Sequence, residues 1–181
     1  MKLILRMITL MAALLIVSES LYAETRDTVK GVADARTLDM SSGERVQLLG
    51  VELSDKQSEA AIGYLERSFV GRDVVIERDE TYSAHRLQDP GHDLQAYVYL
   101  PTRIPDTIDV GHDEWYAHVP KAGFYRIFVN GSLIKQGYSA VERKSEYSLK
   151  NDLILLEEEA RANKRGLWGS SRFESDGSIV S

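Results

Sequence analysis

The sequence predicts an α+β fold, namely a small five-stranded Greek-key β-barrel with one helix after the third strand and another at the C-terminal end. Three observations predict this fold. Residues 29–51 hold three short runs typical of strands, separated by turn residues. Residues 56–70 and 147–165 repeat apolar side chains at helical spacing. Between these two helical stretches lie further strand-like runs, of which 73–78 and 94–100 are the clearest.

The first three strands are expected at residues 29–32, 37–40 and 45–51, after a short linker at 24–28. The Ser-Ser-Gly-Glu sequence at 41–44 has the composition of a hairpin turn. In the third strand polar and apolar residues alternate, which is typical of a strand with one buried face.

The helix expected at residues 56–70 follows a capping box formed by Ser54 and Gln57, whose side chains can cover amides of the first helical turn. Gly71 stands where a residue in the left-handed conformation ends a helix. One apolar stripe of this helix faces the core: Ala61, Leu65 and Phe69.

The middle of the chain breaks the regular pattern. Residues 79–93 are polar and contain Pro90-Gly91, which indicates a loop. The strand at 94–100 follows, with Ala96, Val98 and Leu100 on one face and two tyrosines on the other. Residues 101–123 hold three of the four prolines and are interpreted as an insertion, a hairpin extension that ends in a strand at 124–129.

The C-terminal part is predicted to be helical. A short helix at residues 130–136 is closed by Gly137, and a longer helix spans about 147–165 and stops at Gly166. Residues 157–159 are three glutamates and are expected to form its solvated face. Its apolar seam has steps of four, three and four residues: Leu149, Leu153, Leu156 and Ala160.

The first 23 residues are typical of a secretory signal peptide. Lys2 and Arg6 supply the positive charge, residues 8–17 are apolar, and Ala23 is a small residue at the expected cleavage point. The alternative is an uncleaved membrane anchor, although a predominantly apolar run of this length is short for a membrane span. No second run of spanning length follows, so we expect an exported protein, periplasmic or secreted, with no stable membrane span after cleavage. The mature domain is then residues 24–169, with a flexible tail at 170–181.

The charge argues against a nonspecific nucleic-acid binder. The formal net charge is −6, and loss of Lys2, Arg6 and Glu19 with the signal makes it −7. Proteins that bind the phosphate backbone need a basic face. The chain contains no cysteine, which excludes disulfides, a thiol nucleophile and a lipoprotein attachment cysteine.

Several segments, in the same order, are similar to the staphylococcal nuclease (thermonuclease) family. The Gln-Ala-Tyr-Val-Tyr run resembles that family's Leu-Ala-Tyr-Ile-Tyr strand, and the Gly-Leu-Trp end resembles its closing helix. The resemblance implies an OB-fold-type barrel and an enzyme that cleaves phosphodiesters with calcium, two arginines and a glutamate base. The matching segments are residues 32–37, 46–55, 95–99, 129–138 and 158–168.

Carried over position by position, the working residues of that family are changed in this chain. The family's two arginines fall on Gln47 and Asp93, and its general base falls on Asp55. Its calcium-binding positions fall on Arg36, Glu52 and Leu53. Loss of one preorganised donor costs about 3–4 kcal/mol in comparable oxyanion sites, so losing both arginines should be severe. We hypothesise that Arg36 pairs with Glu52 and stands in for calcium, because the guanidinium fork suits carboxylates.

A relocated active site is the competing interpretation. Arg45 lies two residues from Gln47, on the same side of the strand, and Arg86 and His92 lie in the loop that contains Asp93. The simpler interpretation makes Arg45 and Arg86 solvated surface charges, and we favour it because function must be argued from a site.

The insertion holds a group of metal-ligand residue types at no recognised metal-binding spacing: His112, Asp113, Glu114 and His118. An acidic, hydrated loop explains them as well, and the neighbouring Trp115 and Tyr116 could form a contact patch.

The sequence therefore favours an exported nuclease-fold domain that has lost phosphodiesterase chemistry and binds a protein partner or small ligand. No cofactor is expected on this interpretation. The alternative is a divergent calcium-dependent endonuclease or phosphodiesterase acting on DNA or RNA, for which calcium would be required.

Overall fold

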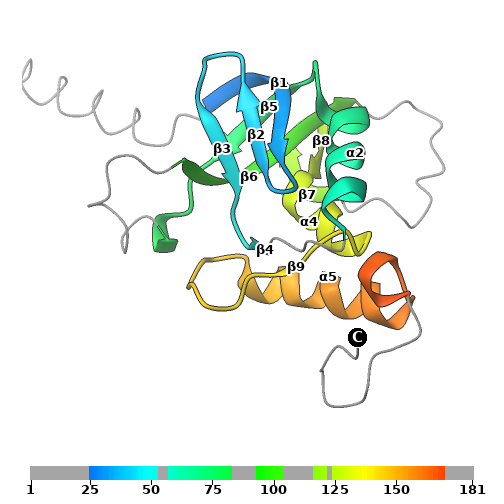
Figure 1. The fold of residues 1–181 in the computed structure, drawn as a ribbon. Helices are drawn as coiled ribbons and strands as arrows, with labels where there is room; N and C mark the ends of the chain where they lie inside the picture. Colours follow the sequence, from blue (N-terminus) through cyan, green and yellow to red (C-terminus); the bar gives the residue numbers. More distant parts are fainter. Residues whose placement is uncertain (1–24, 53–56, 83–92, 104–115, 122–123, 170–181) are drawn as a thin grey trace, which may run out of the picture.

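The computed structural model describes residues 25–52, 57–82, 93–103, 116–121 and 124–169. Five strands in this part of the chain close a barrel, in the order β3-β2-β1-β5-β6 with β3 returning to β6 (Figure 1). The β3–β6 pairing is parallel and the other four are antiparallel. The predicted α+β, OB-fold-type barrel is confirmed. Its strands are β1 (Thr25–Asp34), β2 (Thr37–Met40), β3 (Arg45–Leu48), β5 (Asp73–Glu77) and β6 (Leu94–Arg103).

Apolar side chains from all five strands fill the barrel interior. In β3, Val46 and Leu48 are buried, so the intervening Gln47 lies on the outer side. In β6, every residue from 96 to 100 is buried, because helices cover the second face of this strand. The two rows predicted for β6 therefore both belong to the core.

The helix after the third strand is α2 (Ser58–Phe69), and its predicted stripe of Ala61, Leu65 and Phe69 is buried. Gln57 is the N-cap residue and makes no side-chain capping hydrogen bond. Ser54, the other half of the predicted capping box, lies outside the described residues. The helix stops before Gly71, which has φ 79°.

The predicted strand at residues 45–51 is interrupted. After β3 the chain turns at Gly50, with φ 80°, and resumes as β4 (Val51–Glu52), which pairs with β9 (Ala140–Val141). A Cβ atom on Gly50 would lie 2.5 Å from Cδ1 of Leu153. A side chain at this position would clash with Leu153 of the last long helix, so the turn requires a glycine.

The C-terminal part contains α4 (Val129–Lys135), α5 (Lys150–Ala162) and the 3₁₀ turn η2 (Gly166–Trp168). The backbones of Gly137 and Gly166 are in close contact here. A Cβ atom on Gly137 would lie 2.2 Å from the Arg165 carbonyl oxygen, and a Cβ atom on Gly166 would lie 2.2 Å from the Gly137 carbonyl oxygen. The Leu167 amide donates to the Gly137 carbonyl oxygen at 2.8 Å. This contact joins the end of α4 to the end of α5.

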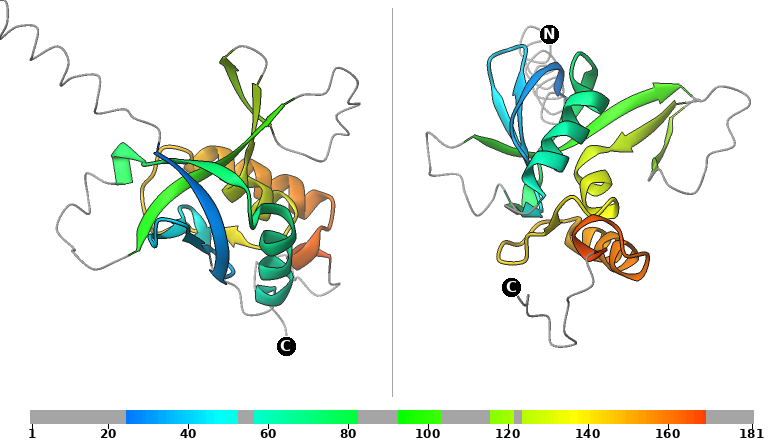
Figure 2. Two further views of the ribbon diagram at one scale, coloured as in Figure 1. Left: turned by 90° about the horizontal axis from the view of Figure 1, so that it is seen from above. Right: turned by 45° about the vertical axis from the view of Figure 1, so that its right-hand side comes forward.

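The insertion builds an arm outside the barrel (Figure 2). β6 continues to Arg103 and pairs with β8 (Phe124–Phe128), which pairs in turn with β7 (Tyr116–Lys121). The predicted hairpin extension is thus present as two antiparallel pairings, with an irregular register between Ala117 and Lys121 in β7.

Two sequence-based expectations are wrong. Residues 25–28 are not a linker, because they form the start of β1 and pair with residues 73–76 of β5. Glu157 is not on a solvated face, since its residue is 1% exposed and its carboxylate accepts hydrogen bonds from Arg143. In the described residues no helix is long and apolar enough to cross a membrane.

Candidate functional site

Gln47 and Asp93 are brought together by the parallel β3–β6 pairing. Gln47 faces Gln95 in the register, and Asp93 immediately precedes β6. Nε2 of Gln47 donates a hydrogen bond to Oδ2 of Asp93 at 3.2 Å, and both residues are half-buried. The outer face of the barrel thus presents an amide–carboxylate pair here, with no positive charge on either side chain.

Arg36 lies in the turn between β1 and β2. Its backbone amide donates to Oδ1 of Asp34 at 2.8 Å, and its carbonyl oxygen accepts from the Leu48 amide at 2.8 Å, so the turn is anchored at both ends. The guanidinium Nη1 reaches the Val51 carbonyl oxygen at 3.5 Å, which is a long hydrogen bond. This contact directs the side chain toward β4.

Two polar atoms at this turn are buried without a hydrogen-bond partner, namely Nε of Arg36 and Oγ1 of Thr37. Thr37 is 1% exposed and pairs across the strands with Gln47. Buried polar atoms are rarely left unpartnered, because each one costs about 1–3 kcal/mol.

Glu52 lies on β4 and is exposed. Among the described residues no ion pair joins it to Arg36, so the hypothesis of an Arg36–Glu52 pair is wrong. The guanidinium contacts the carbonyl of the preceding residue instead. The sequence places these residues near each other correctly but does not reveal which oxygen the guanidinium meets.

Arg45, a proposed substitute for the missing arginines, is bound elsewhere. Its Nε donates to Oδ1 of Asp39 on β2 at 3.1 Å, and the two side chains are 55% and 41% exposed. Such exposed pairs contribute about 0–1 kcal/mol. The geometry fits the interpretation of Arg45 as a surface charge.

Several predicted site residues lie outside the described part of the chain. They are Leu53, Asp55, Arg86, His92, His112, Asp113 and Glu114. His118 falls on β7. Within the described residues, no group of three or more His, Cys, Asp or Glu side chains is placed to hold a metal ion.

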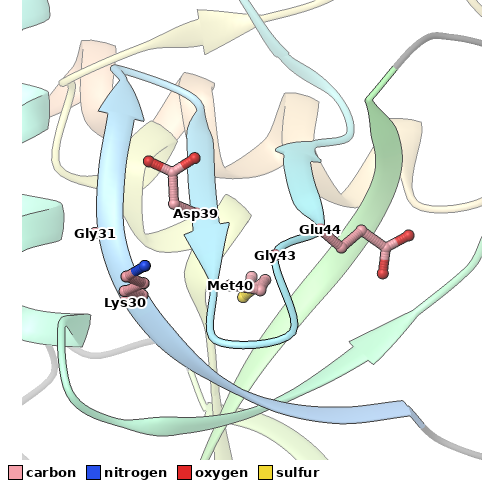
Figure 3. A pocket seen from close by; sticks show the side chains of 6 residues that line it. All are labelled: Lys30, Gly31, Asp39, Met40, Gly43 and Glu44. Atoms are coloured by element: carbon pink, nitrogen blue, oxygen red, sulfur yellow. The ribbon is translucent and has the colours of Figure 1, made fainter.

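A pocket of about 310 Å³ opens beside the Asp39 carboxylate, at the β2–β3 hairpin (Figure 3). It contains none of the residues predicted for the site. Gly31 and Gly43 contribute no side chains to its lining. The Lys30 ammonium and the carboxylates of Asp39 and Glu44 also line it. Its lining residues are Lys30, Gly31, Asp39, Met40, Gly43 and Glu44.

The sequence analysis missed a buried acidic group, Asp79, which is 2% exposed. Its carboxylate accepts hydrogen bonds from the Tyr82 amide at 2.8 Å, the Tyr97 hydroxyl at 2.7 Å and the Ser148 amide at 2.7 Å. Burial alone would raise the pKa of Asp79, but the hydrogen bonds from Ser148 and Tyr97 hold that pKa below its ordinary value. Its place directly after an apolar strand was the only sequence signal. This group joins β5, β6 and the segment before α5.

A family model described as staphylococcal nuclease homologue matches residues 45–170. The chain belongs to this family. The comparison with curated proteins found no match. In this staphylococcal nuclease homologue the match begins at β3, while β1 and β2, which precede it, complete the barrel.

Calcium, which this family implies, does not fit the described residues. Calcium takes six to eight oxygen ligands. At the β1–β2 turn of this staphylococcal nuclease homologue stands a guanidinium, which is always charged and can only donate. It contacts the Val51 carbonyl oxygen, an atom that could otherwise face a cation, and its charge would repel one.

Proposed function

We propose that this staphylococcal nuclease homologue has lost phosphodiesterase chemistry and acts by binding. The observation that carries the proposal is the Gln47–Asp93 hydrogen bond at the two arginine positions of the family. A neutral amide and a carboxylate stand where charge-neutralising donors would have to face a phosphoryl group.

The electrostatics support the same proposal. Three carboxylates belong to these segments: Asp34 is bonded to the Arg36 backbone amide, Glu52 lies on β4 and Asp93 is bonded to Gln47. Arg45, the other cation near the site, is bound to Asp39. A phosphodiester approaching Asp93 would meet repulsion where catalysis requires attraction.

Cleavage is tested with plasmid DNA and total RNA, each with calcium and with a chelator. We expect no cleavage above the buffer blank in either condition. Calcium-dependent cleavage that disappears in Glu52→Ala or Asp55→Ala, but persists in the surface variant Glu44→Ala, would overturn the proposal. That result would establish the alternative, a divergent calcium-dependent endonuclease or phosphodiesterase.

The loss of chemistry can be tested further by restoring the missing groups. Asp93→Arg with Gln47→Arg puts two guanidinium groups on the outer face, at the positions of the hydrogen-bonded pair. Weak calcium-dependent cleavage by this double variant, with none by the native chain, would tie the loss to these two positions. A matched double variant on α5, Asn151→Arg with Asp152→Arg, adds the same charge at two exposed positions of another element and should remain inactive.

A protein that acts by binding needs a surface for its partner. The β6–β8–β7 arm offers such a surface outside the barrel. Long insertions of this kind often carry function. Replacing residues 101–123 by a two-residue hairpin turn should abolish capture of a periplasmic partner in a pull-down and leave the barrel folded. Unchanged capture would assign binding to the barrel face.

Export is part of the proposal and rests on residues 1–23. Cell fractionation and mass spectrometry of the mature N-terminus test it. We expect a protein beginning at Glu24 in the exported fraction. A full-length chain retained in the membrane fraction would instead indicate an uncleaved anchor.

A further inference from the structure

The Arg36 guanidinium at the β1–β2 turn uses only part of its hydrogen-bonding capacity. Nη1 of Arg36 contacts the Val51 carbonyl oxygen, while Nε is buried without a partner. Within the described residues the side chain makes no other hydrogen bond. The Nε–Nη2 edge is therefore unused, and this is an edge through which guanidinium groups bind carboxylates in a two-pronged geometry.

Thr37 is a second, independent observation at the same turn. Its hydroxyl Oγ1 is buried and unpartnered, and the residue is 1% exposed. Two consecutive residues thus each carry a buried donor that no protein group satisfies, the Arg36 Nε–H and the Thr37 hydroxyl. Apolar side chains would fill such positions at lower cost, so the pair indicates a ligand that accepts hydrogen bonds.

We propose that this turn binds a carboxylate group, such as an acidic side chain or the C-terminal carboxylate of a partner. The proposal deepens the proposed function, because it names the chemistry that a binding domain would recognise on this face. Arg36 would hold the carboxylate through the Nε–Nη2 edge, with Thr37 as a further donor. Entry requires the Arg36 side chain to move slightly, since Nε lies below the surface.

The charges around the turn select a monoanion. Asp34 is bonded to the Arg36 amide, Glu52 follows Val51, and Asp93 lies one strand away beside Gln47. These carboxylates repel any anion in proportion to its charge. A planar carboxylate with one charge matches the fork and suffers the least repulsion, whereas a phosphate dianion suffers twice as much.

The test uses the whole chain, labelled with ¹⁵N, and follows the arginine Nε–H resonances by NMR. Acetate, inorganic phosphate and calcium are titrated separately at constant ionic strength. We expect a saturable shift of the Arg36 resonance with acetate and a weaker response to phosphate. Arg45 is an internal reference, because its Nε already donates to Asp39.

Two variants keep the proposal falsifiable. Arg36→Lys retains the charge but loses the fork and its Nε–H resonance, so acetate binding is followed in all variants through the backbone amide resonances of residues 36 and 37. We expect about a tenfold weaker acetate affinity, the value of one charge-assisted hydrogen bond. Thr37→Val removes a hydroxyl that bonds to nothing in the fold, so it should keep or raise the melting temperature and still weaken acetate binding severalfold. A purely structural role for Thr37 predicts the opposite pattern.

The proposal is overturned by any of three results: no saturable shift at Arg36 with acetate, an equal shift at Arg45, or phosphate binding more tightly than acetate. Nucleic-acid cleavage is measured separately. A chain that cleaves nucleic acid but binds acetate through Arg36 would refute the proposed function alone. A chain that does neither would refute this inference alone.

Discussion

The side-chain amide of Gln47 is hydrogen-bonded to the carboxylate of Asp93 at 3.2 Å. This bond links β3 to the residue just before β6. The parallel pairing of these two strands closes the barrel. The Gln47–Asp93 pair therefore lies where the barrel closes, at the positions that correspond to the two arginines of the family.

Gln47→Ala should lower the free energy of unfolding by about 1 kcal/mol, because one half-buried hydrogen bond is lost. Urea denaturation measures it. Gln95→Ala is the matched control, since Gln95 is the half-buried neighbour in the register and has no side-chain hydrogen bond among the described contacts. Equal losses in the two variants would show that the Gln47–Asp93 bond contributes nothing to stability.

The native chain should show the same melting temperature in calcium as in chelator, because Arg36 repels a cation. Arg36→Asp should gain calcium-dependent stabilisation of about 2.7 kcal/mol at a calcium concentration 100 times the dissociation constant. Arg45→Asp makes the same charge change on the same face and should gain none. Stabilisation of the native chain by calcium would show that the Arg36 guanidinium does not exclude the cation.

Asp79 should make stability depend on pH in the acid range. Its hydrogen bonds hold the folded-state pKa below 3.8, so the carboxylate contributes stability above the ordinary pKa. That contribution is lost as pH falls through the folded-state value. In Asp79→Asn this dependence should be absent, and about 3 kcal/mol should be lost at neutral pH.

Acid titrations of both proteins, followed by circular dichroism, measure the difference. Tyr97→Phe should reproduce part of the loss, about 1 kcal/mol, while Tyr99→Phe should not, because the described residues give the Tyr99 hydroxyl no partner. Parallel acid transitions in the native chain and in Asp79→Asn would rule out this role.

Gly137→Ala should be severely destabilising, by about 3 kcal/mol or more, because its Cβ would lie 2.2 Å from the Arg165 carbonyl oxygen. Gly71→Ala is the matched control. Gly71 has a similar positive φ of 79°, with nothing within 4 Å of its Cβ position, so only the backbone cost of about 1 kcal/mol remains. Similar losses in the two variants would show that the glycine–glycine contact adds no stability.

Glu157→Gln should cost about 2 kcal/mol in thermal or urea unfolding. Its buried carboxylate is paired with Arg143 and lies 3.6 Å from Nη2 of Arg161. The loss stays below that of a fully buried pair, since both arginines are about half exposed and remain hydrated. Glu158 is the exposed neighbour of Glu157 and supplies the control. Glu158→Gln should change the free energy of unfolding by less than about 0.5 kcal/mol. A larger change would indicate that loss of surface charge, not of the buried pair, explains the effect of Glu157→Gln.

Much of the fold could be predicted because apolar spacing reports burial directly. The stripe of Ala61, Leu65 and Phe69 and the seam of α5 were found in this way. The start of β1 was missed because residues 25–28 pair through their backbone and carry mostly polar side chains. Glu157 was assigned to solvent because its pairing with Arg143, 14 residues earlier in the chain, does not show in the helix spacing.

The candidate site was less predictable than the fold. Gln47 and Asp93, chosen by family position, are hydrogen-bonded to each other, but a sequence does not give the direction of a long side chain. Arg36 meets a backbone carbonyl rather than Glu52, and Arg45 meets Asp39. Asp79 was missed because a single acidic residue after a strand resembles any other loop residue.

The glycine contact at the end of α5 also affects biosynthesis. Arg165, Gly166 and Leu167 supply the last backbone contacts to Gly137, and they come late in translation. A nascent chain still tethered to the ribosome cannot acquire its final packing until these residues emerge. Such a delay would leave the barrel strands without their docked C-terminal helix until then.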